Sequence, residues 1–417
     1  MTDSTRVKLE PLGATFNKLW SATLASHLAD GLFKTAVPLL AATLTRDPVI
    51  IAALSAIVML PWLLFAIPIG SLVDRVDRRK AMALANSIRF IASAVLTLAI
   101  VSGVVNIPIL YIIAFVIGAA DVLYDTTAQA LLPQMLKPEL LERGNSRLQI
   151  GATMVGEMVG SPMSGILYVI AIGLPFISGT LGVLLAAVLV AVIPGSYKRV
   201  MNLTHDGSEP VKTSLMADMK FGIRYLYEDK NLLKLVLFTT TVGFWFSATG
   251  STMVLFMLHD LKVPVSAFGF VLLASAVGNI IGGFVAPKLS GRFGRMNTMA
   301  VAIFLSGFVM AIGGFSPNVW VWIALAIVGG VAMAQWNILL MSTYHQIIPN
   351  ELFGRIHGTR RTLVWGLMPV GSMVGGLLAK IDLRAPMIIG GGLAALISLF
   401  GIPFVRSLSK LVETEKA

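Results

Sequence analysis

The chain of 417 residues is 56% hydrophobic and 13% charged, and its mean hydropathy is +0.83. Soluble domains contain about 45–50% apolar and about 25% charged residues, so this composition excludes them and indicates an integral membrane protein. The absence of cysteine excludes disulfides, thiolate metal sites and cysteine nucleophiles. We attribute the net charge of +11 to basic loops that face anionic lipid, and expect no nucleic-acid partner.

The chain begins with a polar segment, residues 1–18. It carries Arg6, Lys8 and Lys18 ahead of an apolar run that is too long for the core of a signal peptide. We therefore expect an uncleaved cytoplasmic tail.

Twelve apolar runs follow, and each is long enough to cross a bilayer as a helix of about 20 residues. They lie at about 19–44, 49–72, 81–102, 108–132, 147–168, 174–194, 232–258, 265–289, 297–315, 319–343, 361–380 and 386–405. The sequence therefore predicts an all-α membrane protein with two six-helix bundles. The expected parts are a tail (1–18), an N-terminal bundle (19–194), a linker (195–231), a C-terminal bundle (232–405) and a cytoplasmic tail (406–417).

The connectors between the runs fall alternately on the two sides of the membrane, so the distribution of their basic residues tests the predicted number and order of spans. The side that holds both termini carries 26 of the 32 Lys and Arg residues, whereas the opposite side carries only Arg46, Lys262, Lys380 and Arg384. Cytoplasmic loops of membrane proteins are enriched in Lys and Arg. Both termini are therefore predicted to be cytoplasmic, in a multi-pass protein of the cell membrane.

The two groups of six runs repeat each other. The segment 160–167 (GSPMSGIL) recurs 211 residues later as 371–378 (GSMVGGLL), and Leu131-Leu132-Pro133 recurs as Ile347-Ile348-Pro349. Because similar features keep one order and nearly one offset, we predict two parallel repeats related by an axis along the membrane normal. The long connector between them contains an amphipathic pattern over 214–227, which predicts a helix on the inner membrane surface.

Residues 70–80 (GSLVDRVDRRK) form a dense group of charges between the second and third apolar runs. Such charge cannot lie in hydrocarbon, so we predict a short turn in water. The stretch resembles the loop between the second and third helices of the major facilitator superfamily. Together with 28–32 (LADGL), 60–62 (LPW) and 130–133 (ALLP), it is most similar to the drug-exporter branch that includes macrolide and siderophore exporters.

The resemblance implies the major facilitator fold and a conformational latch at this loop. In the family, the aspartate of the motif meets an arginine at the cytoplasmic end of the fourth span and a helix N-terminus of the other half. Carried onto this chain, the latch comprises Gly70, Asp74, Arg75, Arg78 and Arg79, with Arg143 as a suggested partner. Asp77 stands where the family commonly has glycine, and we expect it to stiffen the turn. A charge cluster that only sets orientation is the alternative.

Charged residues inside the predicted spans are functional candidates, since each costs roughly 2.5–3.5 kcal/mol at the centre of a membrane helix. All of them lie in the first half: Asp30, Lys34, Arg89, Asp121, Asp125 and Glu157. The four acids exceed the two bases, so at least one carboxylate is expected without a fixed partner, where it can load and release a proton. We rank the acids for proton coupling as Asp30, Asp121, Glu157 and Asp125, with Lys34 and Arg89 as charge partners. Structural ion pairs are the alternative for each.

Two further sets of residues are candidates for motion and for substrate contact. In the fifth span, Gly160, Pro162 and Gly165 resemble a degraded form of the exporter family's Gly-Pro motif and are predicted as a hinge, with close helix packing as the alternative. The second set could line a cavity for large lipophilic substrates, although anchoring at lipid fits each aromatic member equally well. It comprises Phe244, Trp245, Phe246, Trp336, Asn337 and Trp365.

Sequence motifs for catalysis are absent. The chain has no G-x-x-x-x-G-K-[ST] phosphate loop and no H-E-x-x-H, so we expect no enzyme, no cofactor and no metal site. The residues and the resemblance together predict a monomeric, proton-coupled secondary transporter that exports amphipathic small molecules across the lipid bilayer. A dedicated metabolite or siderophore exporter and a non-transporting sensor or scaffold are the alternatives.

Overall fold

The computed structural model describes residues 11–73, 75–198 and 215–414, whose regular elements are all helical. The first half contains α1 (Ala14–Leu44), α2 (Pro48–Val73), α3 (Arg78–Val101), α4 (Ile107–Met135), α5 (Pro138–Ala152), the π-helix η1 (Thr153–Gly160), α6 (Ser161–Ile170) and α7 (Leu174–Ala191). The second half contains α8 (Leu215–Glu228), α9 (Lys230–Gly250), α10 (Met253–Leu255), η2 (Phe256–Asp260), α11 (Val265–Phe293), α12 (Arg295–Gly313), α13 (Val319–Ile347), α14 (Asn350–Gly366), α15 (Met368–Ile381), η3 (Pro386–Gly390) and α16 (Gly391–Thr414).

Several of these helices join end to end into longer rods, namely α5–η1–α6, α9–α10–η2, α14–α15 and η3–α16. Within the described ranges, each of the twelve predicted apolar runs coincides with one helix or rod. Ten of them are long and apolar enough to cross a membrane. The other two are α1 and the rod α5–η1–α6, and both carry charged residues of the site described below.

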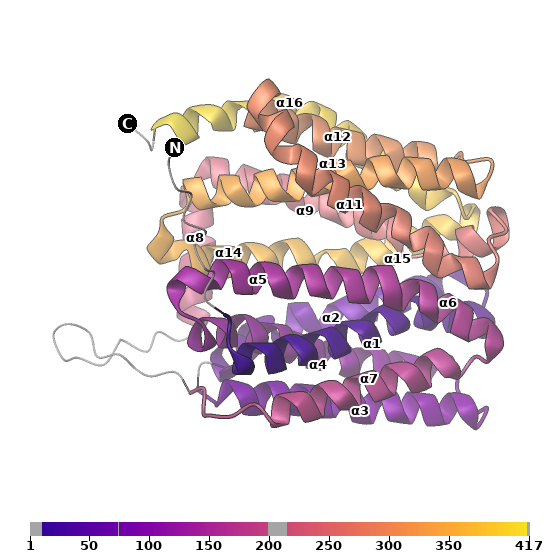
Figure 1. Cartoon of the computed structure of the whole chain (residues 1–417). Helices are drawn as coiled ribbons and strands as arrows, with labels where there is room; N and C mark the ends of the chain where they lie inside the picture. Colours follow the sequence, from indigo (N-terminus) through magenta and orange to yellow (C-terminus); the bar gives the residue numbers. More distant parts are fainter. Residues whose placement is uncertain (1–10, 74, 199–214, 415–417) are drawn as a thin grey trace, which may run out of the picture.

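The helices lie side by side in two groups, α1–α7 and α9–α16, with their axes roughly parallel (Figure 1). The predicted class, an all-α membrane protein made of two bundles, is confirmed. Figure 1 also places both ends of the described chain and α8 at one end of the molecule. We call this the termini end, and the opposite one, where α1 ends and α2 begins, the far end.

Among the described helices, the most extensive contacts between the bundles are those of α2 with α15 and of α6 with α11. The backbones of α6 and α11 touch, because a Cβ atom added at Gly269 would clash with the carbonyl oxygen of Ser161. Small residues allow membrane helices to approach this closely.

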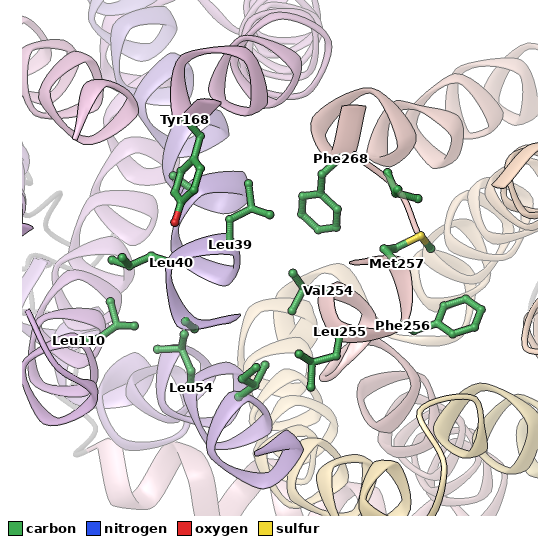
Figure 2. Close-up of a cluster of buried hydrophobic side chains, with 14 of the residues drawn as sticks. Leu39, Leu40, Leu54, Leu110, Tyr168, Val254, Leu255, Phe256, Met257 and Phe268 are labelled. Carbon is green, nitrogen blue, oxygen red and sulfur yellow. The ribbon is translucent and has the colours of Figure 1, made fainter. Parts of the chain in front are cut away.

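The far end is sealed by apolar side chains from both bundles (Figure 2). Leu39 and Leu40 of α1 belong to the same buried cluster as Val254 and Phe268 of the second half. One ion pair crosses between the bundles at this end, with Lys380 Nζ 3.4 Å from Asp47 Oδ2. The N–H of Val49 and, secondarily, Lys380 lower the pKa of Asp47 despite partial desolvation, so the Asp47 carboxylate is ionised at neutral pH. The far end is therefore closed.

The close approach of α6 and α11 gives a testable prediction. Gly269→Ala places a methyl group against the Ser161 carbonyl oxygen, so we expect it to lower stability by about 1–3 kcal/mol through overpacking. The measurement is the melting temperature of the purified protein in detergent. Gly283→Ala is the control, because this glycine lies on the same helix with no atom within 4 Å of an added Cβ. Equal melting temperatures for the two variants would contradict the close contact.

Candidate functional site

Arg89 is the centre of a polar cluster inside the N-terminal bundle. It lies on α3, its side chain is only 3% exposed, and it forms ion pairs with Asp30 of α1 and Asp121 of α4. Arg89 Nε lies 2.8 Å from Asp121 Oδ1, and Nη1 donates to Ser26 Oγ at 2.6 Å. A buried cation without a partner is strongly destabilising. The two carboxylates therefore hold Arg89 in place, and Arg89 ties three helices together.

The two carboxylates differ from Arg89 in being partly open. Asp30 is 40% exposed and Asp121 is 36% exposed, and His27 Nδ1 lies 3.5 Å from Asp30 Oδ2. One guanidinium thus serves two accessible acids. Neutralising either acid removes its own attraction to Arg89 and leaves Arg89 attracted to the other acid alone.

Lys34 and Glu157 form a second ion pair, with Nζ 3.1 Å from Oε1. Lys34 therefore pairs across helices with Glu157, rather than along α1 with Asp30. Glu157 lies in η1, a π-helical segment whose backbone contacts α1, since a Cβ atom at Gly31 would clash with the carbonyl oxygen of Gly156. π-Helical turns within α-helices occur frequently at functional sites.

The hinge candidates lie where this π-helix ends. Gly160 is its last residue and Pro162 is in the first turn of α6. Gly165 faces the other bundle, because an added Cβ atom would lie 2.9 Å from the carbonyl oxygen of Ser266. The irregular backbone is thus located at the predicted hinge, and Gly165 has a packing role between the bundles.

Asp125 lies one turn from Asp121 on α4 and differs from the other three acids. None of the described residues forms an ion pair with it. It lines a cavity of about 620 Å³ between α1, α4 and α5, together with His27 and Glu142. Arg361, on α14 of the other bundle, interacts with Asp125 electrostatically.

Arg361 is a residue that sequence reasoning placed in a connector, because the apolar run begins only there. In the structure α14 begins at Asn350, so Arg361 lies three turns inside a rod. Its guanidinium stacks on Trp62 of α2 at 4.3 Å and on Trp365 at 4.7 Å, and the two indole rings are 5.1 Å apart. The start of α14 directly after Pro349 is the sequence signal that could have located it.

The aromatic candidates do not share one location. Trp365 lies at the contact between the bundles, while Trp336 is 5% exposed and packs against Phe238 within the C-terminal bundle. Phe246 lines a smaller cavity of about 220 Å³. The remaining candidates are Phe244 and Trp245, which form an edge-to-face pair, and the exposed Asn337.

Among the latch residues, Asp74 lies outside the described residues. Arg78 is buried and donates to the carbonyl oxygen of Ala130 at 3.0 Å, and Arg79 donates to that of Ile193 at 2.7 Å. These bonds attach the loop to α4 and to the segment after α7. The other members are Gly70, which is half-buried near the end of α2, the exposed Arg75, and Arg143 on α5.

Asp77 caps the N-terminus of α3, with Oδ1 accepting from the N–H groups of Arg79 and Lys80. Its Oδ2 accepts from Ser196 Oγ at 2.7 Å and from the N–H of Tyr197 at 3.3 Å. Desolvation opposes ionisation, but these four hydrogen bonds outweigh it and lower the pKa of Asp77. The carboxylate therefore joins the α2–α3 turn to the chain that leaves α7.

Comparisons with known proteins identify the family. The model of the Major Facilitator Superfamily matches residues 19–369 and 235–416. Macrolide efflux protein A of Streptococcus pyogenes is 21% identical over 95% of this chain and 97% of its own length. The multidrug efflux pump Tap of Mycolicibacterium fortuitum is 23% identical over 80% and 84%. A bacterial homologue of the iron transporter ferroportin, solved in an inward-facing state, has a TM-score of 0.74 at 14% identity, over 95% of this chain and all of the other.

The position of Asp77 predicts a pH-dependent contribution to stability. Since its folded pKa lies below the ordinary value of 3.8, the contribution is present above pH 3.8 and is lost as the pH falls through the folded pKa. Asp77→Asn keeps a capping side chain but removes the charge, so we expect its melting temperature to be lower than wild type at pH 7 and equal to it at the lowest pH. Asp77→Ala also loses the helix cap, which lowers the free energy of unfolding by a further ~0.5–2 kcal/mol. A difference in melting temperature between wild type and Asp77→Asn that does not change with pH would contradict this prediction.

Proposed function

We propose that this chain, which belongs to the Major Facilitator Superfamily, is a proton-coupled exporter of amphipathic organic compounds that works by alternating access. The family and its structural neighbours are transporters, so the chain is a membrane transporter and not an enzyme. The observation that supports the proton coupling is that one buried cation, Arg89, is shared by two accessible carboxylates. The two bundles, 19–194 and 232–405, are its moving bodies in a monomer.

Protons act on the Arg89 cluster in this proposal. When both Asp30 and Asp121 are ionised, these two carboxylates and Arg89 together carry a net charge of −1 inside the bundle. A net charge in this environment costs free energy. A proton bound by either acid removes that charge and leaves Arg89 paired with the other. Because the acids lie on different helices, the choice of partner changes the attraction between α3 and either α1 or α4.

Asp125 connects this chemistry to the second bundle. Ionised Asp125 attracts Arg361 across the boundary between the bundles, whereas protonated Asp125 does not. We rank Asp125 last from sequence, but it is the acid without an ion pair among the described residues, which supports a role in signalling protonation to α14. The stacking of Arg361 on Trp62 and Trp365 holds its guanidinium at that boundary.

Substrate entry is proposed at the termini end, which we take as cytoplasmic from the charge count. The sealed far end and the cavity at Asp125 both favour access from this side. The efflux relatives that match most of the chain support export as the direction of transport and amphipathic compounds as the substrates. The loop over 70–80, with Asp74, is the proposed latch that closes the termini end in the state in which the far end is open.

Carboxamide variants test the proton coupling. In proteoliposomes with an imposed pH gradient, we expect Asp30→Asn and Asp121→Asn to reduce proton-linked transport at least tenfold, because each removes a group that binds the proton. Glu157→Gln is the third variant. The substrate is a macrolide or lipophilic dye chosen by an accumulation screen in an efflux-deficient host, repeated with a proton uncoupler. Asp382→Asn, in the exposed loop at the far end, is the control and is expected to retain transport.

Wild-type proton-linked transport in all three single variants would exclude the mechanism. Loss of transport together with loss of protein from the membrane would not count as support, so the amount and melting temperature of each variant are measured alongside. A wild type that moves no compound in the screen would favour the sensor or scaffold alternative.

A further inference from the structure

An apolar groove lies on the C-terminal bundle, away from the polar cluster. Its volume is about 630 Å³, and it lies between α11, α12 and α13, with Arg406 of α16 at its rim. The strongest neighbours of α12 are α13 and α16, and Figure 1 places α12 and α16 at the edge of the molecule farthest from the first bundle. The groove is therefore on the outer side of the protein, where a membrane would surround it.

The groove runs from the termini end toward the middle of the bundle. On α12 its lining extends from Asn297, near the start of the helix, to Leu305. Eight residues of helix correspond to about 12 Å. One leaflet of the hydrocarbon core is roughly 15 Å thick, half of the full core. The depth of the groove thus suits one acyl chain that enters from the leaflet at the termini end.

The lining of the groove is almost wholly apolar below its rim. Its exposed or partly exposed members include Phe293, Val301, Leu305 and Val328. Val301, which is 53% exposed, projects from α12 beside the groove without belonging to the buried core. An acyl chain therefore finds a shaped apolar surface here, rather than a flat helix face.

Among the described residues, the rim of the groove carries bases and no carboxylate. Arg406 is exposed at the rim, and the guanidinium of Arg292 lies 5.4 Å from the ring centre of Phe293, which lines the groove. No aspartate or glutamate occurs anywhere from residue 261 to residue 350, so α11, α12 and α13 carry no acid that could neutralise these bases. Neither arginine forms an ion pair with another described residue.

We propose that this groove is a binding site for one anionic phospholipid. One acyl chain lies between α11, α12 and α13, and the phosphate of the headgroup is held by Arg406 and Arg292. Charge complementarity selects an anionic lipid over a zwitterionic one, since each base near a membrane surface changes the affinity roughly fivefold. The site is independent of the proposed transport chemistry.

The test uses the purified full chain in a neutral detergent. Phosphatidylglycerol and phosphatidylcholine with identical acyl chains are added separately, and the melting temperature and the number of lipids retained in native mass spectrometry are measured. We expect phosphatidylglycerol alone to raise the melting temperature and to be retained as one molecule. Arg406→Gln combined with Arg292→Gln should weaken this binding more than tenfold.

Two further variants separate a shaped site from general attraction. Val301→Trp fills the groove without changing the charge, and it should weaken lipid binding while leaving the lipid-free melting temperature near that of wild type. Lys234→Gln removes an exposed base near the start of α9, outside the groove, and should bind phosphatidylglycerol as wild type does.

Three outcomes would overturn the proposal. Equal losses in Lys234→Gln and in the double arginine variant would indicate attraction by the whole basic surface. Full binding by Val301→Trp would show that the groove is not used. Equal stabilisation by glycerol phosphate, which has no acyl chain, would identify a site for soluble phosphate instead of a lipid.

Discussion

The arrangement of the N-terminal bundle depends on the burial of one cation. Arg89 is buried inside a bundle of mainly apolar helices, and the carboxylates that α1 and α4 present to it compensate for the burial of its charge. This requirement fixes the relative rotation of α1, α3 and α4. With α1 oriented in this way, Lys34 reaches Glu157 on η1, and with α4 oriented in this way, Asp125 lines the neighbouring cavity.

The two bundles share a fold but differ in their chemistry. The first bundle contains four acids and two bases in its predicted spans, whereas the second has no acid between residues 261 and 350. The backbone features thus repeat between the halves, whereas the charged residues do not. Glycines at close helix contacts recur in both halves, as at Gly160 and Gly371, while the ion pairs of Lys34 and Arg89 lie in the first half. The basic groove on α12 is a consequence of the same asymmetry, since no acid there balances Arg292 and Arg406.

Much of this could be predicted from the sequence, because hydrophobic length and the positions of charges are local properties. The apolar runs matched the helices, and the surplus of acids around Arg89 followed from counting. The pairing of Lys34 with Glu157 could not be predicted, since the spacing of four residues from Asp30 favours a pair within α1, and only the close contact of α1 with η1 brings Glu157 nearer. Arg361 was missed for a related reason: a helix that begins outside the apolar run brings a charge to the boundary between the bundles.

The two ends of the molecule are held by different kinds of interaction, which bears on how the proposed proton coupling acts. The far end is closed mainly by apolar burial, whose free energy depends on area and hardly on pH. Among the described residues, the ion pair that crosses between the bundles at this end involves Asp47, whose lowered pKa keeps it ionised at physiological pH. Asp125 and Arg361, by contrast, lie on the other side of this seal and interact electrostatically between the bundles, so protonation of Asp125 would remove that attraction. In the proposed mechanism, a proton would therefore change the free energy of contacts at the termini end but not at the far end, and such a difference between two states is what shifts their equilibrium.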